Sequence, residues 1–244
     1  MQNYLFLQKN ISKAMKKFMY IVLAVAAIAA CKGREAKKGV EKAEEISVTT
    51  EALDTTVYSI VTNMGTIKVR LYRDTPQHKQ NFEKLVKEGY YDSLLFHRVI
   101  NGFMIQGGDP YTRDTSKVDL YGQGGPDYTI PAEMRDTTGA PLHRHSKGAL
   151  AAARRGDLAN PFKESSGSQF YIVQDPDHCV HLDGEYTVFG QTVAGFNVID
   201  KIAGVKTDRY DRPINDVRII TIKPDKELNK KPVLGTNLAK EITE

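Results

Sequence analysis

Short runs of alternating apolar and polar residues dominate the chain between residues 58 and 222. Many of these runs are rich in β-branched and aromatic residues and end at glycine or asparagine, which predicts β-strands. The clearest runs cover residues 58–63, 66–72, 96–100, 103–105, 169–173, 187–193 and 217–222. Counting the strands gives about eight, so the pattern predicts a mainly β domain.

Two segments change to the period of an α-helix. In the first, Thr75 suits the N-cap, Pro76 suits N1, and Gly89 suits the C-terminal end. The apolar stripes consist of Phe82, Leu85 and Val86 in the first segment, and of Phe196, Ile199 and Ile202 in the second. We therefore expect two helices with one face each on the sheet. His78 is expected to be a solvated residue of the first helix.

The stretch from residue 96 to residue 109, FHRVINGFMIQGGD, carries the densest chemistry. Asn101-Gly102 separates its two apolar runs, and both residues accept the positive φ that a type I′ turn requires. The stretch therefore predicts a β-hairpin. Its two short strands bring together a cation, aromatic rings, a thioether and an amide.

The first 30 residues have the organisation of a secretory signal. Lys16 and Lys17 precede an apolar run, 18–30, which is too short to span a bilayer comfortably. The run ends in Ile-Ala-Ala before Cys31, which resembles the lipobox of bacterial lipoproteins and implies that Cys31 carries the lipid. An ordinary signal peptide with an incidental cysteine is the alternative. Translation from Met15 instead of Met1 would still leave a complete signal.

These features divide the chain into four parts. We expect residues 1–30 to be a signal peptide of the lipoprotein type and residues 31–54 to be a flexible tether, because they are rich in Lys, Glu, Ala and Thr and hold few apolar residues. Residues 55–223 are the predicted domain, and residues 224–244 are a charged tail expected to be poorly ordered. A lipid on Cys31 implies a bacterial envelope protein whose domain lies outside the cytoplasm, in the periplasm.

The charge of the chain argues against nucleic-acid binding. The formal net charge is +4, but the first 30 residues contain four lysines and no acidic residue. Removing them leaves 30 basic and 30 acidic residues, because the whole chain has 34 and 30. A neutral domain lacks the basic footprint of a nucleic-acid-binding protein. The two cysteines, Cys31 and Cys179, do not form a disulfide framework.

Three blocks of residues resemble the motifs of the cyclophilin-type peptidyl-prolyl cis–trans isomerases. They are FHRVI at 96–100 with GFMIQGGD at 102–109, GALAAAR at 148–154 with GSQFYI at 167–172, and LDG at 182–184 with VFG at 188–190. The resemblance covers about residues 56–223. It implies a closed, eight-stranded antiparallel β-barrel capped by two α-helices. The interior of such a barrel is filled by side chains, so that a site must lie outside it.

The resemblance implies a role for each matching residue. Arg98 matches the catalytic arginine. The residues implied in substrate binding are Phe103, Met104, Tyr171 and Leu182 in a proline pocket, Gln106 and Gln169 as polar contacts, Ala153 and Arg154 on a strand edge, and His181 and Tyr186 near the rim. Gln106 is implied to orient Arg98 and the substrate.

Four of these positions depart from the commonest family residues. Arg154 stands where the family most often has Asn, Tyr171 where Phe is commonest, and Tyr186 where many members have His. His181 replaces an aromatic residue that is often Trp. We expect this change to weaken cyclosporin binding more than catalysis. The alternative is that an insertion before Leu182 turns His181 toward solvent.

Other chemistry has little support in the sequence. No nucleophile stands beside a base, and the pairs His143/His145 and His178/His181 lack a third ligand at a fixed spacing. The glycine-rich segment 122–126 lacks a phosphate-binding Gly-Lys-Ser/Thr and is expected to be a flexible loop. We expect no metal and no cofactor.

Two functions remain open. The first is a monomeric isomerase that accelerates X–Pro bond rotation in extracytoplasmic proteins. The second is a catalytically silent module that binds Pro-containing segments. The presence of Arg98 together with Phe103, Gln106 and Gln169 favours the enzyme.

Overall fold

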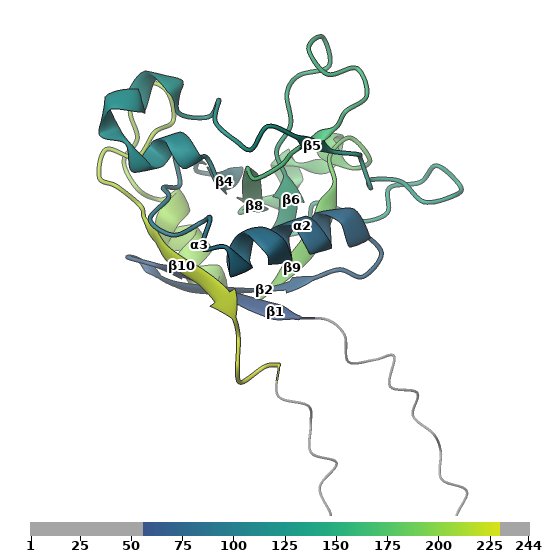
Figure 1. The fold of residues 1–244 in the computed structure, drawn as a ribbon, viewed down its shortest axis with the longest axis horizontal. Helices are drawn as coiled ribbons and strands as arrows, with labels where there is room; N and C mark the ends of the chain where they lie inside the picture. The colour runs from purple at the N-terminus through teal and green to yellow at the C-terminus, as the bar shows by residue number, and fades with distance from the viewer. Residues whose placement is uncertain (1–55, 230–244) are drawn as a thin grey trace, which may run out of the picture. The chain divides into compact units, whose positions relative to one another are not determined.

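The computed structural model describes residues 56–229, which form one eight-stranded antiparallel sheet with helices packed against it (Figure 1). In sheet order the strands are β10 (Ile219–Pro224), β1 (Val57–Thr62), β2 (Gly65–Leu71), β9 (Val188–Ala194), β6 (Ala149–Ala152), β8 (Phe170–Val173), β4 (Met104–Gly107) and β3 (Arg98–Ile100). A small second sheet pairs β5 (Thr129–Ile130) with β7 (Ser165–Ser166). The predicted signal peptide, the tether and residues 230–244 lie outside the described residues.

The large sheet curls so that its two ends approach each other. The end strands β3 and β10 form no ladder within the described chain. Instead, Leu95 makes an isolated bridge to Arg218, and the backbone N–H of Phe96 donates to the carbonyl of Val217 at 2.9 Å. The prediction of a mainly β fold with eight antiparallel strands is confirmed, and the sheet has the form of a curled half-barrel.

The core lies between the inner face of the sheet and helix α2 (Pro76–Lys87). As predicted, Phe82, Leu85 and Val86 form the buried stripe of this helix. The Phe82 ring meets the ring of Phe170 at 76°, with 6.1 Å between centroids. Such edge-to-face contacts favour the quadrupoles of both rings. Because aromatic side chains fill this interior, a ligand site must lie on the outside of the sheet.

The start of α2 differs from the prediction. Thr75 occupies the N-cap position, but its side chain makes no capping hydrogen bond. The carboxylate of Glu133 takes that role, because it accepts from the backbone N–H of Gln77 at 3.0 Å and of His78 at 3.1 Å. His78 is buried, and its Nδ1 lies 2.7 Å from Glu133. The expectation of a solvated His78 is therefore wrong, because a distant loop covers this end of the helix.

The second predicted helix is α3 (Phe196–Ala203). Its buried residues are Val198, Ile199, Ile202 and Ala203, whereas Phe196 is 36% exposed. The buried stripe is therefore shifted by comparison with the prediction. Within residues 56–229, no helix is long and apolar enough to cross a membrane.

The first residues after the predicted domain boundary are ordered. Asp225 is buried and accepts a hydrogen bond from the Ser59 hydroxyl at 2.8 Å, and Lys68 Nζ lies 2.8 Å from the same carboxylate oxygen. The side-chain oxygen of Asn229 accepts from the backbone N–H of Val57 at 2.8 Å. The expectation of poor order is therefore wrong for residues 224–229, since these contacts pin them to the first strands.

Candidate active site

The β3–β4 hairpin forms as predicted, but with a different turn. Ile100 pairs with Met104, so three residues lie between the strands. Of Asn101 and Gly102, only Gly102 has a positive φ, of 76°. The backbone N–H of Phe103 donates to the carbonyl of Ile100 at 3.1 Å, which places Gly102 where a type II turn needs a positive φ. The type I′ turn is therefore wrong, and the strand register shifts by one residue.

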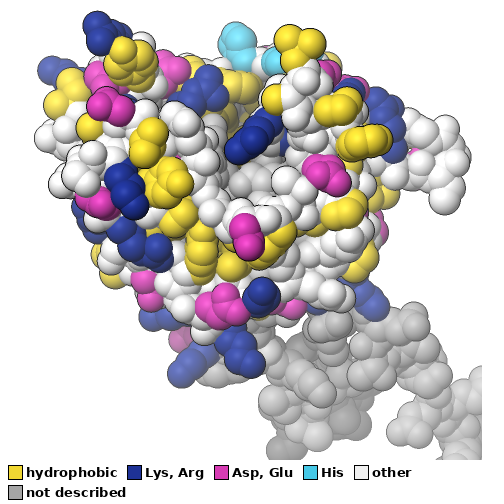
Figure 2. All heavy atoms as spheres, turned by 45° about the horizontal axis from the view of Figure 1, so that its top comes forward, with side chains coloured by type: hydrophobic (Ala, Val, Ile, Leu, Met, Phe, Trp, Pro, Cys, Tyr) yellow, Lys and Arg dark blue, Asp and Glu magenta, His cyan; other side chains and the backbone are white. Residues whose placement is uncertain are grey.

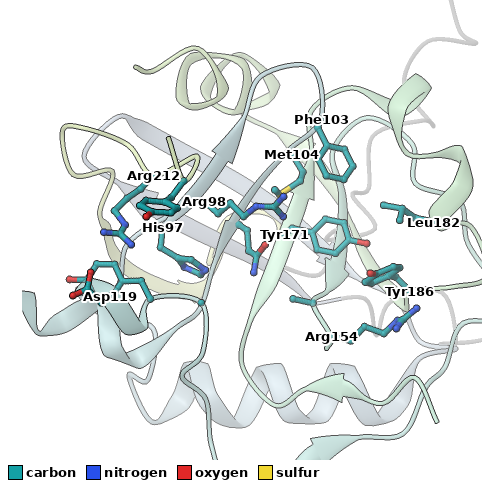
Figure 3. A pocket seen from close by; sticks show the side chains of 15 residues that line it. His97, Arg98, Phe103, Met104, Asp119, Arg154, Tyr171, Leu182, Tyr186 and Arg212 are labelled. Carbon is teal, nitrogen blue, oxygen red and sulfur yellow. The ribbon is translucent and has the colours of Figure 1, made fainter. Parts of the chain in front are cut away.

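A pocket of about 640 Å³ opens beside this hairpin on the outside of the sheet. The predicted site residues that line it are Arg98, Phe103, Met104, Gln106, Ala153, Arg154, Tyr171, Leu182 and Tyr186. Hydrophobic and basic side chains border a hollow on the face turned toward the reader in Figure 2. Figure 3 shows Arg98 between two groups of labelled side chains, with Phe103, Met104, Tyr171, Leu182 and Tyr186 on one side.

One part of the pocket is apolar and rigid. Met104 and Tyr171 come from the neighbouring strands β4 and β8, and both are buried. Leu182 is buried in the short 3₁₀ helix η5 (Val180–Leu182), and the ring of Tyr186 meets that of Tyr171 at 80°. Phe103 packs against the same cluster. These walls suit an apolar ring of small size, because the sheet holds their positions.

The Tyr171 hydroxyl is held by a buried hydrogen-bonded chain. It lies 2.9 Å from His145 Nε2, and His145 Nδ1 lies 2.8 Å from the carboxylate of Asp183. Burial raises the pKa of Tyr171 well above its ordinary value. Burial also lowers the pKa of His145, although the bond to Asp183 opposes this shift. His145 therefore braces the pocket wall, a role that sequence reasoning missed because His145 and Tyr171 are 26 residues apart.

Two amides connect the pocket to the glycine-rich loop. Gln106 Nε2 donates to Gln169 Oε1 at 3.0 Å, and Gln169 Nε2 donates to the carbonyls of Gly122 at 2.9 Å and Gly124 at 2.7 Å. The buried carboxylate of Asp109 accepts from the N–H groups of both glycines. These bonds hold the loop in one conformation, in contrast to the flexible loop expected. Gln169 acts behind the pocket and does not line it.

Arg154 is almost fully engaged with the protein. Its side chain is 5% exposed, and its guanidinium contacts the Asp157 carboxylate at 2.5 Å and the Glu185 carbonyl at 3.0 Å. It also lies over the ring of Tyr186, 4.4 Å from the centroid. The side chain therefore forms part of the wall. The backbone groups of Ala153 already bond to Gln169 and Ser166, whereas the backbone of Arg154 has no such partner among residues 56–229.

His181 does not reach the pocket. Its side chain is exposed on η5, and it does not line the cavity. His181 therefore does not form the expected pocket edge. The alternative, in which His181 faces solvent, is the one that the structure shows. Leu182 and Tyr186 supply the wall instead.

The other half of the pocket is lined by residues that were not among the predicted site residues. Its lining residues are His97, Asp119, Tyr121, Gly122, Tyr210 and Arg212. Burial lowers the pKa of His97 to about 4, so the ring is neutral at physiological pH. Arg212 Nη2 donates to the carbonyl of Val118 at 2.8 Å, which joins two loops 94 residues apart. Such pairing across loops leaves no local sequence signal, although His97 adjoins the motif arginine.

Comparisons with known proteins agree with this geometry. The profile of the family described as "Cyclophilin type peptidyl-prolyl cis-trans isomerase/CLD" matches residues 57–224. The chain therefore belongs to the cyclophilin family of peptidyl-prolyl cis–trans isomerases.

Curated relatives share this region. Peptidyl-prolyl cis-trans isomerase CYP18-2 of Arabidopsis thaliana is 34% identical over 68% of this chain and 91% of its own length. Isomerase ppi1 of Schizosaccharomyces pombe is 38% identical over 65% of this chain and 92% of its own length. The match to the isomerase-like 2 protein of Rhizopus delemar spans only 28% of that longer protein.

Solved structures are also similar. A cyclophilin-type isomerase from Cryptosporidium parvum has a TM-score of 0.60 and 29% identity, covering 70% of this chain and 98% of that one. The same protein crystallised in the presence of the dipeptide Ala-Pro has a TM-score of 0.59.

Proposed function

We propose that this chain is an active isomerase for X–Pro bonds in extended polypeptides outside the cytoplasm. The observation that carries the proposal is the placement of the half-exposed guanidinium of Arg98 in one pocket with Phe103, Met104 and Tyr171. Catalysis of amide rotation calls for this arrangement, in which a cation lies beside an apolar wall that fits a proline ring. The structure of the Cryptosporidium parvum isomerase in the presence of the dipeptide Ala-Pro supports a Pro-containing ligand for this pocket.

The barrier to rotation is electronic. Resonance holds the peptide bond planar behind a barrier of about 18–20 kcal/mol, and X–Pro bonds isomerise over tens to hundreds of seconds. Acceleration by five decades needs about 7 kcal/mol of preferential binding to the transition state. No nucleophile or proton transfer is needed, because only the twist of the amide changes.

Each part of the pocket contributes to that preference. The apolar wall holds the proline ring in place, so that the carbonyl group of the preceding residue rotates relative to a fixed ring. As the amide twists, its nitrogen lone pair is released from resonance and becomes a good hydrogen-bond acceptor. The guanidinium of Arg98 is placed to donate to it, and the planar ground state accepts far more weakly. The free backbone of Arg154 is available to align the substrate chain.

The cellular context of the proposal comes from the N-terminal sequence. The basic and apolar segment before Cys31 supports a lipid-anchored protein of a bacterial envelope, with clients in the periplasm. A silent binding module is the second candidate. Arg98 favours the enzyme, because binding a proline ring alone needs only the apolar wall.

A coupled proteolysis assay on an X–Pro peptide tests the activity. We expect isomerisation to exceed the spontaneous rate, and Arg98→Ala to lower kcat/KM by about 100- to 1000-fold, or about 3–4 kcal/mol. The melting temperature should stay within about 2 °C, since Arg98 lies at the rim. Arg98→Lys should restore little, because a point charge cannot reproduce the planar fork. Full activity of Arg98→Ala would refute this mechanism, and a silent wild type would favour the binding module.

A further inference from the structure

We propose that Asp211 positions the guanidinium of Arg98 for isomerisation, so that the loop before β10 is a working part of the active site. The proposal rests on the isomerase function proposed above. It adds a residue that lies more than 100 positions from the motif of Arg98 and outside all three sequence blocks.

Asp211 is the acidic partner of Arg98 in the described chain. Its Oδ2 lies 3.6 Å from Arg98 Nε, and both side chains are 45% exposed. The backbone N–H of Val99 donates to the Asp211 carbonyl at 2.8 Å, which fixes the loop beside the strand that carries Arg98. Gln106, which pairs with Arg98 across the hairpin, donates its side-chain N–H to Gln169 instead.

The loop around Asp211 is built to hold one shape. The carboxylate of Asp208 accepts from the backbone N–H of Tyr210 at 2.8 Å and of Arg212 at 3.0 Å. The N–H of Asp208 donates to the Arg212 carbonyl at 2.8 Å, and the N–H of Asp211 donates to the Asp208 carbonyl at 3.1 Å. These four bonds tie the two ends of a short turn. The carboxylate of Asp211 is therefore presented from a rigid support.

The backbone of Asp211 gives a second, independent observation. Its φ is 61°, in the left-handed region that favours glycine. Aspartate and asparagine tolerate this region better than other side chains, but glycine adopts it without strain. An aspartate here, with its carboxylate toward Arg98, indicates that the side chain has a use beyond shaping the turn.

The contact suits a catalytic arginine. A long side chain on an edge strand samples many rotamers, and this conformational freedom is lost when the side chain binds the transition state. The carboxylate restricts this motion beforehand. Because it approaches Nε, the two Nη groups remain available to the substrate, and no described residue hydrogen-bonds them. Exposed ion pairs add little to stability. We therefore expect the Asp211–Arg98 pair to affect the rate of isomerisation and not the stability of the fold.

The test combines two variants at Asp211 with the loss of Arg98. Asp211→Asn removes the charge but keeps the size of the side chain and its tolerance of a positive φ. Asp211→Gly removes the side chain and relieves the backbone strain. We expect each to lower kcat/KM about 3- to 10-fold, mainly through kcat, with unchanged or higher thermal stability for the glycine variant. In an Arg98→Ala background, neither should have a further effect. Asp216→Asn is the matched control, because it removes an exposed ion pair of 2.7 Å to Arg218 that does not touch Arg98.

A second measurement reads the position of Arg98 directly. Nuclear magnetic relaxation of the Arg98 Nε–Hε group should show a more restricted side chain in the wild type than in Asp211→Asn, and the difference should shrink at high salt. Equal activity of wild type and Asp211→Asn would overturn the proposal, as would an equal loss in the Arg98→Ala background. If the wild type itself is inactive, the proposed function and this role fall together, whereas an active wild type that is indifferent to Asp211 refutes only the latter.

Discussion

His97 illustrates how a single residue in this pocket is set by its surroundings. It precedes Arg98 in the chain, and the residue is only 5% exposed. Burial disfavours the charged form, so the pKa falls from 6.5 to about 4. A neutral ring adds no second positive charge beside Arg98. Arg98 therefore remains the main hydrogen-bond donor in this part of the pocket.

The lowered pKa of His97 predicts a pH dependence of stability. In the unfolded chain the imidazole binds a proton below about pH 6.5, whereas the folded chain resists this until about pH 4. The contribution of neutral His97 is therefore complete above pH 6.5 and is lost as the pH falls toward 4. Between pH 7.5 and 4.5 the wild type should lose about 2–3 kcal/mol more unfolding free energy than His97→Gln, measured by urea denaturation. Parallel curves for the two proteins would contradict this account.

At the scale of elements, the start of helix α2 depends on a residue from far along the chain. Glu133 accepts from two backbone N–H groups of the first turn and from the His78 ring, and its side chain is 11% exposed. Burial opposes its ionisation, but these hydrogen bonds lower its pKa overall. The negative charge also suits the positive end of the helix dipole. One carboxylate thus connects α2 to the loop that precedes β6.

Removing this cap should destabilise the domain. We expect Glu133→Ala to lower the unfolding free energy by about 2–3 kcal/mol, because it leaves two backbone N–H groups of the first turn and the buried His78 ring without this partner. Glu133→Gln should cost less, since its amide oxygen still accepts. Gln77→Ala, an exposed change in the same helical turn, is the control and should stay within about 0.5 kcal/mol. Chemical denaturation measures all three, and a Glu133→Ala variant as stable as the control would show that Thr75 or water replaces the cap.

At the scale of the whole molecule, the N-terminal segment is predicted to decide where the enzyme works. Cys31→Ala should release the protein from membranes, because the thiol is the predicted lipid attachment site and one or more acyl chains supply the anchor. Fractionation at high salt measures this. Cys179→Ala is the control: its thiol is buried, and burial raises its pKa to about 11. A Cys31→Ala variant that still sediments with membranes would place the anchor elsewhere.

The sequence by itself determined the elements and the centre of the site. Period-two runs predicted the strands, the stripe of Phe82, Leu85 and Val86 predicted a helix, and the resemblance of the three motif blocks to the cyclophilins predicted the apolar wall. These signals are local, since periodicity and turn residues act over a few positions. The same local view misread Asn101-Gly102, because turn type depends on the strand register that the partner strands impose.

Only the tertiary structure decided which residues support that site. Asp211 reaches Arg98, His145 connects Asp183 to Tyr171, and Glu133 reaches His78, and each of these contacts spans 26 to 113 positions of sequence. A short polar side chain in a loop looks the same in sequence whether it faces solvent or a buried partner. Its meaning depends on which strand the curled sheet brings beside it, because hydrogen bonds and ion pairs act over a few ångströms of space and carry no trace in the spacing of residues along the chain.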